Sequence, residues 1–124
     1  MKVLVVDDNG DAARSLSMLV ELLGHEVRTG FDGLEALTIA GAFHPDAILL
    51  DLGMPVMDGY EACRLIRQQP WGRTVTVVAV TGWGREEDRL KSQRAGFDQH
   101  LVKPASPKLI AEILREVQEI PRSL

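Results

Sequence analysis

The sequence has one cysteine and no long apolar run. Cys63 has no second cysteine to pair with, so no disulfide can form within the chain. No stretch approaches the roughly 18 to 20 consecutive apolar residues that a membrane-spanning helix needs. The residues after Met1 lead directly into a strand-like run, without the zones of a signal peptide. We therefore expect a cytoplasmic protein that has no membrane segment.

The chain also lacks an excess of positive charge. The chain carries 14 Lys and Arg residues against 18 Asp and Glu residues, which gives a formal net charge of −4. The basic residues are scattered, so no surface for a phosphate backbone is expected and nucleic acid is not a predicted direct partner. At 124 residues the chain has the usual size of one compact domain. We predict a single domain over residues 1–124.

Four short apolar runs recur along the chain, at residues 3–6, 47–50, 75–80 and 101–102. The first three are too short for helices and rich in β-branched residues. All four are predicted to be buried strands of a parallel sheet that is covered on both faces. Residues 25–29 carry charges between their apolar positions, which favours a strand at the sheet edge.

Segments with helical spacing lie between the strands. Two sets of apolar residues are each expected to lie on one face of a helix. The first set is Ala12, Leu16, Leu19, Val20 and Leu23, and the second is Ile110, Ile113, Leu114 and Val117. Gly24 is expected to end the first helix, and Ser106 with Pro107 to begin the last. This alternation of strands and helices predicts a doubly wound α/β fold with helices on both faces.

The helix expected over residues 85–94 differs from the others, because Leu90 is its only large apolar residue. Its acidic residues come first and its basic residues last, an order that the helix dipole favours. We expect a helix with a small buried contact, which is easily moved.

Polar side chains follow four of the predicted strands: Asp7 and Asp8, then Asp51, then Thr81, then Lys103. The carboxyl ends of parallel strands meet at one edge of a sheet, so these side chains are expected to converge. Three close carboxylates repel one another by about a few kcal/mol per pair. A cation is therefore expected among them, and oxygen ligands without cysteine or histidine favour Mg²⁺.

This set of residues suits phosphoryl transfer. Asp51 is the predicted nucleophile, because a carboxylate can form an acyl phosphate. Thr81 would donate its hydroxyl to the attached phosphoryl group, and Lys103 would contact one of its oxygens. The predicted metal ligands are oxygens of Asp8, Asp51 and the Gly53 carbonyl, with Asp7 acting partly through water.

Five short segments together resemble the receiver domain of two-component response regulators. They are residues 5–9 (VVDDN), 49–55 (LLDLGMP), 57–59 (MDG), 80–82 (VTG) and 101–104 (LVKP), which occur in the order and with the spacing of that family. The likeness covers essentially the whole chain. Residues 23–27 and 95–104 look especially like the receivers of hybrid histidine kinases.

The resemblance implies a flavodoxin-like sheet of five strands in the order 2-1-3-4-5 with five helices, and often a cis peptide before Pro104. It implies a phosphoacceptor signalling domain, not an enzyme with turnover, in a phosphorelay. The donor would be a sensor histidine kinase or a histidine phosphotransfer protein. A homodimer or an effector would bind the surface of the helix over residues 85–94, the last strand and the last helix.

Three residues depart from the commonest pattern of the family. His100 occupies a place where the family usually carries Tyr or Phe, the ring that turns inward on activation, so His100 and Thr81 are the expected switch residues. Gly53 offers no side chain beside the phosphoryl group. Trp83 places an indole where a polar residue is common, and it is a candidate gate for hydrolytic water.

Two other functions fit parts of the sequence. A small phosphohydrolase of the haloacid dehalogenase type would also use an aspartyl phosphate, but it needs a second acid where this chain has Gly53. An interaction module that keeps the fold without becoming phosphorylated is the other alternative. The complete acidic cluster argues against that module, since degenerate relatives commonly lose those residues.

Overall fold

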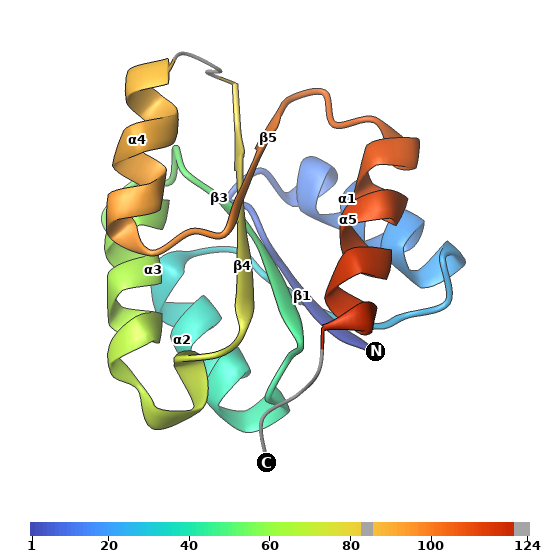
Figure 1. The fold of residues 1–124 in the computed structure, drawn as a ribbon, viewed down its shortest axis with the longest axis horizontal. Helices are drawn as coiled ribbons and strands as arrows, with labels where there is room; N and C mark the ends of the chain where they lie inside the picture. Colours follow the sequence, from blue (N-terminus) through green and yellow to red (C-terminus); the bar gives the residue numbers. More distant parts are fainter. Residues whose placement is uncertain (83–85, 121–124) are drawn as a thin grey trace.

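The computed structural model describes residues 1–82 and 86–120, in which strands and helices alternate (Figure 1). The strands are β1 (Lys2–Val6), β2 (Glu26–Gly30), β3 (Ala47–Asp51), β4 (Thr76–Thr81) and β5 (Gln99–Val102). The helices are α1 (Gly10–Leu22), α2 (Gly33–Phe43), α3 (Gly59–Gln68), α4 (Glu86–Ala95) and α5 (Pro107–Glu119), and a 3₁₀ turn, η1 (Pro70–Gly72), follows α3. The strands form one parallel sheet in the order β2-β1-β3-β4-β5, which confirms the predicted fold.

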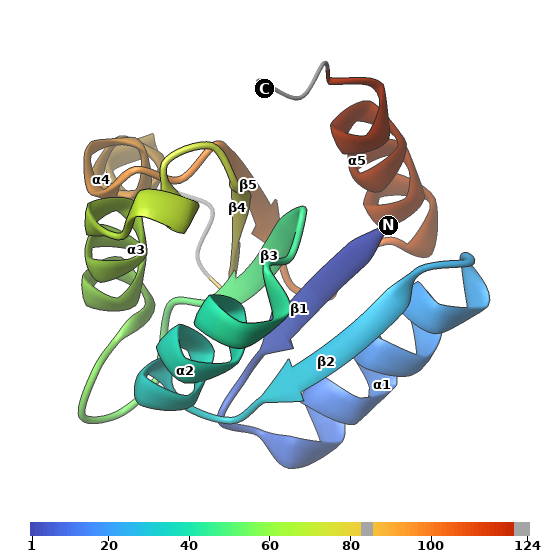
Figure 2. The ribbon, with the colours of Figure 1, turned by 90° about the horizontal axis from the view of Figure 1, so that it is seen from below.

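The sheet separates two apolar cores. Figure 2 shows α1 and α5 on one face of the sheet and α2, α3 and α4 on the other. Side chains alternate between the faces along each strand, so that Leu4 and Ile48 point into the core under α2 and α3, while Val3 and Leu49 point into the core under α5. Every residue of β3 and β4 is buried, as their continuous apolar sequences predict.

Local signals placed the helix ends correctly. Gly24 follows α1 with a φ of +97°, a conformation that glycine adopts without steric cost. The Ser106 hydroxyl accepts a hydrogen bond from the amide of Leu109 at 3.4 Å, and Pro107 is the first residue of α5. The Lys103–Pro104 peptide is cis.

The predicted apolar stripe of α1 is confirmed in part, because Val20 lies in the core and Leu16 and Leu19 pack against it. Ala13, Ser17 and Val20 are buried, whereas Leu16 is half-buried and Leu23 is 38% exposed. The helix is turned toward the edge strand β2, where the hydroxyl of Ser17 lies 2.8 Å from the hydroxyl of Thr29. Leu16 also lines, together with Ile110 of α5, the groove between the two helices.

The guanidinium group of Arg67 on α3 joins three backbone segments, a contact that the sequence does not predict. Arg67 donates hydrogen bonds to the carbonyls of Gly72, Val75 and Gly96, and its Nη2 lies 2.8 Å from Oδ2 of Asp98. It thereby links the end of α3, the start of β4 and the turn between α4 and β5.

Cys63 is fully buried on the inner face of α3, as expected for a small apolar side chain. Burial raises the pKa of its thiol to about 11, so the thiol stays protonated at neutral pH. Within residues 1–82 and 86–120, no helix is both long enough and apolar enough to cross a membrane.

Candidate functional site

Three carboxylates gather at the carboxyl edge of the sheet. Asp7 and Asp8 directly follow β1, and Asp51 is the last residue of β3. One oxygen from each lies within 4.8 Å of the others. Asp7 and Asp51 are buried, while Asp8 is exposed. The cluster therefore has a protein side and an open side, which is the arrangement that a ligand from solvent needs.

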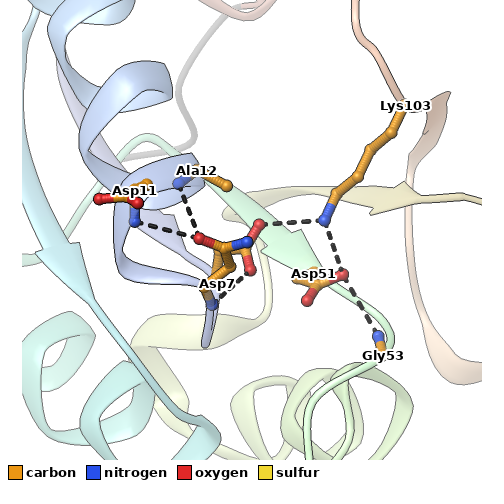
Figure 3. A network of polar contacts seen from close by, with 7 residues as sticks. Asp7, Asp11, Ala12, Asp51, Gly53 and Lys103 are labelled. Carbon is orange, nitrogen blue, oxygen red and sulfur yellow. Dashed lines mark hydrogen bonds and ion pairs between the residues drawn. The ribbon is translucent and has the colours of Figure 1, made fainter.

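Lys103 brings a positive charge into the cluster from the end of β5. Its Nζ lies 3.0 Å from Oδ2 of Asp7 and 3.4 Å from Oδ1 of Asp51 (Figure 3). Burial by itself would lower the pKa of Lys103, but the hydrogen bond to Asp7 and the negative charges of Asp51 and Asp7 raise it overall. The ammonium group is therefore charged throughout the neutral pH range.

The carboxyl group of Asp51 is destabilised in its ionised form. Burial raises its pKa, and the nearby charge of Asp7 raises it further. The amide of Gly53, which donates to Oδ1 of Asp51 at 3.3 Å, and the charge of Lys103 compensate only in part. A carboxylate in this position gains from any additional cation.

Two loops hold the acidic residues in place. Asp7 accepts the amide of Asn9 at 2.9 Å, and the Asn9 side chain caps α1 by accepting the amides of Asp11 and Ala12, each at 3.1 Å (Figure 3). On the other side Gly59 begins α3 close to the phosphoacceptor candidate. A Cβ atom on Gly59 would lie 2.4 Å from the carbonyl oxygen of Asp51, so only glycine fits there. The sequence indicated a turn at Gly59 but not this contact.

The loop between β3 and α3 contains a strained residue. Val56 has a φ of +67° and its side chain is fully exposed. The amide of Met57 donates to the carbonyl of Pro55 at 2.8 Å, so the chain makes a γ-turn at Val56. A β-branched residue is unfavourable in this conformation, and such strain is commonly found beside functional sites.

Thr81 and His100 lie on neighbouring strands. Thr81 ends β4, is 1% exposed, and its carbonyl accepts the amide of Lys103 at 2.7 Å. His100 pairs with Ala79 in the sheet and its ring faces α4, where Nδ1 lies 3.2 Å from the hydroxyl of Ser92. Trp83, the predicted gate, falls outside the described residues.

An apolar groove adjoins the site. It has a volume of about 570 Å³ and runs between α1 and α5, with Leu16, Leu19 and Ile110 among its lining residues. Asp7 and Lys103 also line it, so the groove leads to the acidic cluster.

Comparison with known proteins agrees with this geometry. The profile of the response regulator receiver domain family matches residues 3–115. The chain is 37% identical over 116 residues to the probable transcriptional regulator ycf27 of Cyanophora paradoxa, covering 94% of this chain and 47% of that protein. It is also 37% identical to a 14.6 kDa protein encoded in the sodA1 3′ region of Leptolyngbya boryana, covering 96% of this chain and 88% of that protein. The chain thus spans about half the length of the ycf27 relative.

Solved structures of receiver domains superpose closely. The chemotaxis protein CheY4 of Vibrio cholerae matches with a TM-score of 0.89 at 33% identity, covering 94% of this chain and 97% of that one. The receiver domain of the sensor histidine kinase PA1611 of Pseudomonas aeruginosa matches with a TM-score of 0.87 at 34% identity, covering 95% and 98%. In that structure a magnesium ion is coordinated in the active site cleft. From its sequence match, its fold and its strand-end residues, the chain belongs to the response regulator receiver domain family.

Proposed function

We propose that the chain is a phosphoacceptor switch that takes a phosphoryl group onto Asp51 in a Mg²⁺-dependent reaction. The observation that carries this proposal is the convergence of Asp7, Asp8 and Asp51 within 4.8 Å beside the ammonium of Lys103. A carboxylate oxygen of Asp51 would attack the phosphorus atom of the donor. The bond between phosphorus and the donor would break as the acyl phosphate forms.

The acidic cluster suits a hard divalent cation. Asp7, Asp8 and Asp51 supply oxygen atoms, and no cysteine or histidine belongs to the cluster among the described residues. The carbonyl of Gly53 would be a further ligand. A bound Mg²⁺ would neutralise charge on the transferred oxygens. The exposed side of Asp8 leaves room for water and phosphate oxygens.

The other residues of the site position the phosphoryl group. Lys103 is close enough to Asp51 to pair with one phosphoryl oxygen once Asp51 is modified. The Thr81 hydroxyl would turn toward another oxygen and carry the change into the loop after β4. The domain thereby assists its own phosphorylation and dephosphorylation, without turnover of external substrate.

Labelling with acetyl phosphate and Mg²⁺ tests the phosphoacceptor directly. Wild type should form an acyl phosphate that intact-mass spectrometry detects, and Asp51→Asn should form none. Asp11→Asn is the matched control, because Asp11 is exposed in the first turn of α1 and makes no contact with the cluster. Labelling of Asp51→Asn at the wild-type level would refute the assignment.

Two further assays separate the alternatives. Steady hydrolysis of p-nitrophenyl phosphate would favour the phosphohydrolase and contradict a simple switch. Transfer from a phosphorylated histidine kinase or histidine phosphotransfer protein would exclude the interaction module that is never phosphorylated.

We propose that the phosphoryl donor binds in the groove between α1 and α5, and that this takes place in the cytoplasm. A helix of a sensor kinase or phosphotransfer protein that lies there would place its histidine near Lys103, where the groove ends. Ser15→Glu adds a charge at an exposed lining position, and it should slow phosphotransfer from the protein donor but not labelling by acetyl phosphate. Met18→Glu, on an α1 position outside the groove lining, is the control. Equal effects of both variants would contradict this docking site.

The output surface is proposed to be α4, β5 and α5. Each of these elements exposes one large apolar side chain, Leu90 at 47%, Val102 at 38% and Leu109 at 43%. Phosphorylation would reposition α4 and thereby alter this surface, which then binds an effector or a second copy of the chain. Sedimentation with and without acetyl phosphate distinguishes the second copy from an effector.

A further inference from the structure

Helix α4 packs on the domain through a hydroxyl and a methyl group. Its one large apolar side chain, Leu90, is 47% exposed, whereas Ser92 is 1% and Ala95 4% exposed. Ser92 faces β5, the strand that leads to Lys103. A buried polar side chain at a helix contact needs hydrogen-bond partners, and the partners of Ser92 define how α4 is held.

The hydroxyl of Ser92 has three polar neighbours, one of which is the phenol of Tyr60 on α3. Oγ of Ser92 lies 2.9 Å from the carbonyl oxygen of Asp88, one turn earlier in α4, and 3.2 Å from Nδ1 of His100. A carbonyl can only accept, so the single hydroxyl proton of Ser92 is donated to Asp88. Oγ must therefore accept from His100, whose Nδ1 carries the proton. The contact thus selects the Nδ1–H tautomer of the neutral imidazole.

The other described contacts of α4 lead mainly to α3. Lys91 Nζ lies 4.3 Å from the centroid of the Tyr60 ring, and Arg67 donates to the carbonyl of Gly96 at 2.7 Å. Figure 1 shows α4 and α3 side by side, on the same face of the sheet. The bond from Ser92 to His100 is therefore a direct polar link between α4 and the strand that enters the phosphorylation site.

We infer that the Ser92–His100 hydrogen bond is a latch that holds α4 against β5 in the unphosphorylated chain and opens when α4 moves. Opening it leaves the Ser92 hydroxyl donating to the carbonyl of Asp88, so this buried hydroxyl keeps a hydrogen-bond acceptor. One ordinary hydrogen bond corresponds to roughly a fivefold change in an equilibrium constant. A latch of that strength biases the position of α4 without locking it. The opening step rests on the proposed function, whereas the closed latch does not.

Nitrogen NMR of the imidazole rings tests the closed latch without any phosphorylation. The chain has three histidines, and at about pH 8 ordinary imidazoles are mostly neutral. His100 should show a protonated Nδ1 and an unprotonated Nε2 in wild type. Ser92→Ala, which preserves helix propensity, should abolish this pattern at His100 and leave exposed His44 unchanged. A wild-type His100 with its proton on Nε2 would overturn the latch.

The initial rate of labelling by acetyl phosphate tests the opening step. Ser92→Ala should be labelled several-fold faster than wild type, because the moved position of α4 becomes more populated. Gln93→Ala, an exposed neighbour, should match wild type. Equal rates for Ser92→Ala and wild type would overturn the regulatory role. Absence of labelling in wild type would instead overturn the proposed function, while the tautomer measurement still decides whether the latch exists.

Discussion

Arg67 and Asp98 form an ion pair beneath the first residues of β4, with Nη2 of Arg67 2.8 Å from Oδ2 of Asp98. The same carboxylate oxygen accepts the amide of Val77 at 2.9 Å, and the amide of Asp98 donates to the carbonyl of Val77 at 2.8 Å. Asp98 therefore connects the turn before β5 to β4 on one side and to α3 on the other. The pair closes the end of the sheet opposite the acidic cluster.

Arg67→Ala should lower the free energy of unfolding by about 2–3 kcal/mol, because it strands several carbonyl acceptors that Arg67 now satisfies. Partial exposure of Asp98 limits the loss. Urea unfolding, followed by circular dichroism, measures this loss of unfolding free energy. Arg64→Ala, on the exposed side of the same helix, should change stability by no more than about 0.5 kcal/mol. A similar loss in both variants would show that the network contributes little.

Millimolar Mg²⁺ should raise the melting temperature of wild type, because a cation that binds only the folded cluster stabilises it by mass action. Asp8→Ala removes one carboxylate from the open side and should reduce the shift. Asp11→Asn should retain it. A shift of the same size in Asp8→Ala, or none in wild type, would count against the metal site.

Asp51→Asn should melt at a higher temperature than wild type near pH 7 when Mg²⁺ is absent. The raised pKa of Asp51 means that the folded state binds this proton more tightly than the unfolded state does. The corresponding stability is present at acid pH and is lost as the pH rises through the folded-state pKa. The difference between the variants should therefore shrink on acidification below the ordinary value of 3.8. A wild type that is the more stable of the two at neutral pH would contradict this account.

Val56→Asn should stabilise the fold by about 1 kcal/mol, since asparagine tolerates a positive φ that costs a β-branched residue about that amount. Val56→Thr keeps the branched Cβ and should leave the stability unchanged. Because the side chain is fully exposed, neither variant loses a buried contact. Thermal melting of the two variants compares them, and equal midpoints would rule out strain at this residue.

The sheet and the acidic cluster were predictable because both depend on short local patterns. Continuous apolar runs mark β3 and β4, and the polar residues at their ends, Asp51 and Thr81, are brought together by the parallel arrangement alone. The Arg67–Asp98 pair was missed because its partners are far apart in sequence and neither follows a strand end. A lone arginine one residue after the buried Ile66 was the available signal.

The sequence also could not predict the orientation of α1 or the hydrogen-bond partner of His100. The apolar stripe predicted that Leu16 lies on the core, but it did not predict that Leu16 also lines the groove beside α5, which depends on how Ser17 packs against Thr29. His100 stood out as an unusual residue, but Ser92 is an ordinary residue of a polar helix. Its role depends on the approach of α4 to β5.

The sheet lies between two apolar cores that share backbone but few side chains. A change of volume at Ile110, on the inner face of α5, leaves the contacts of Ile66, on the inner face of α3, intact, so such substitutions should combine additively. Evolution can therefore reshape the helices that flank the groove between α1 and α5 and those that hold α4 by separate series of mutations. If the groove between α1 and α5 binds the phosphoryl donor as proposed, such a domain can change its donor while the packing beneath α4 stays the same.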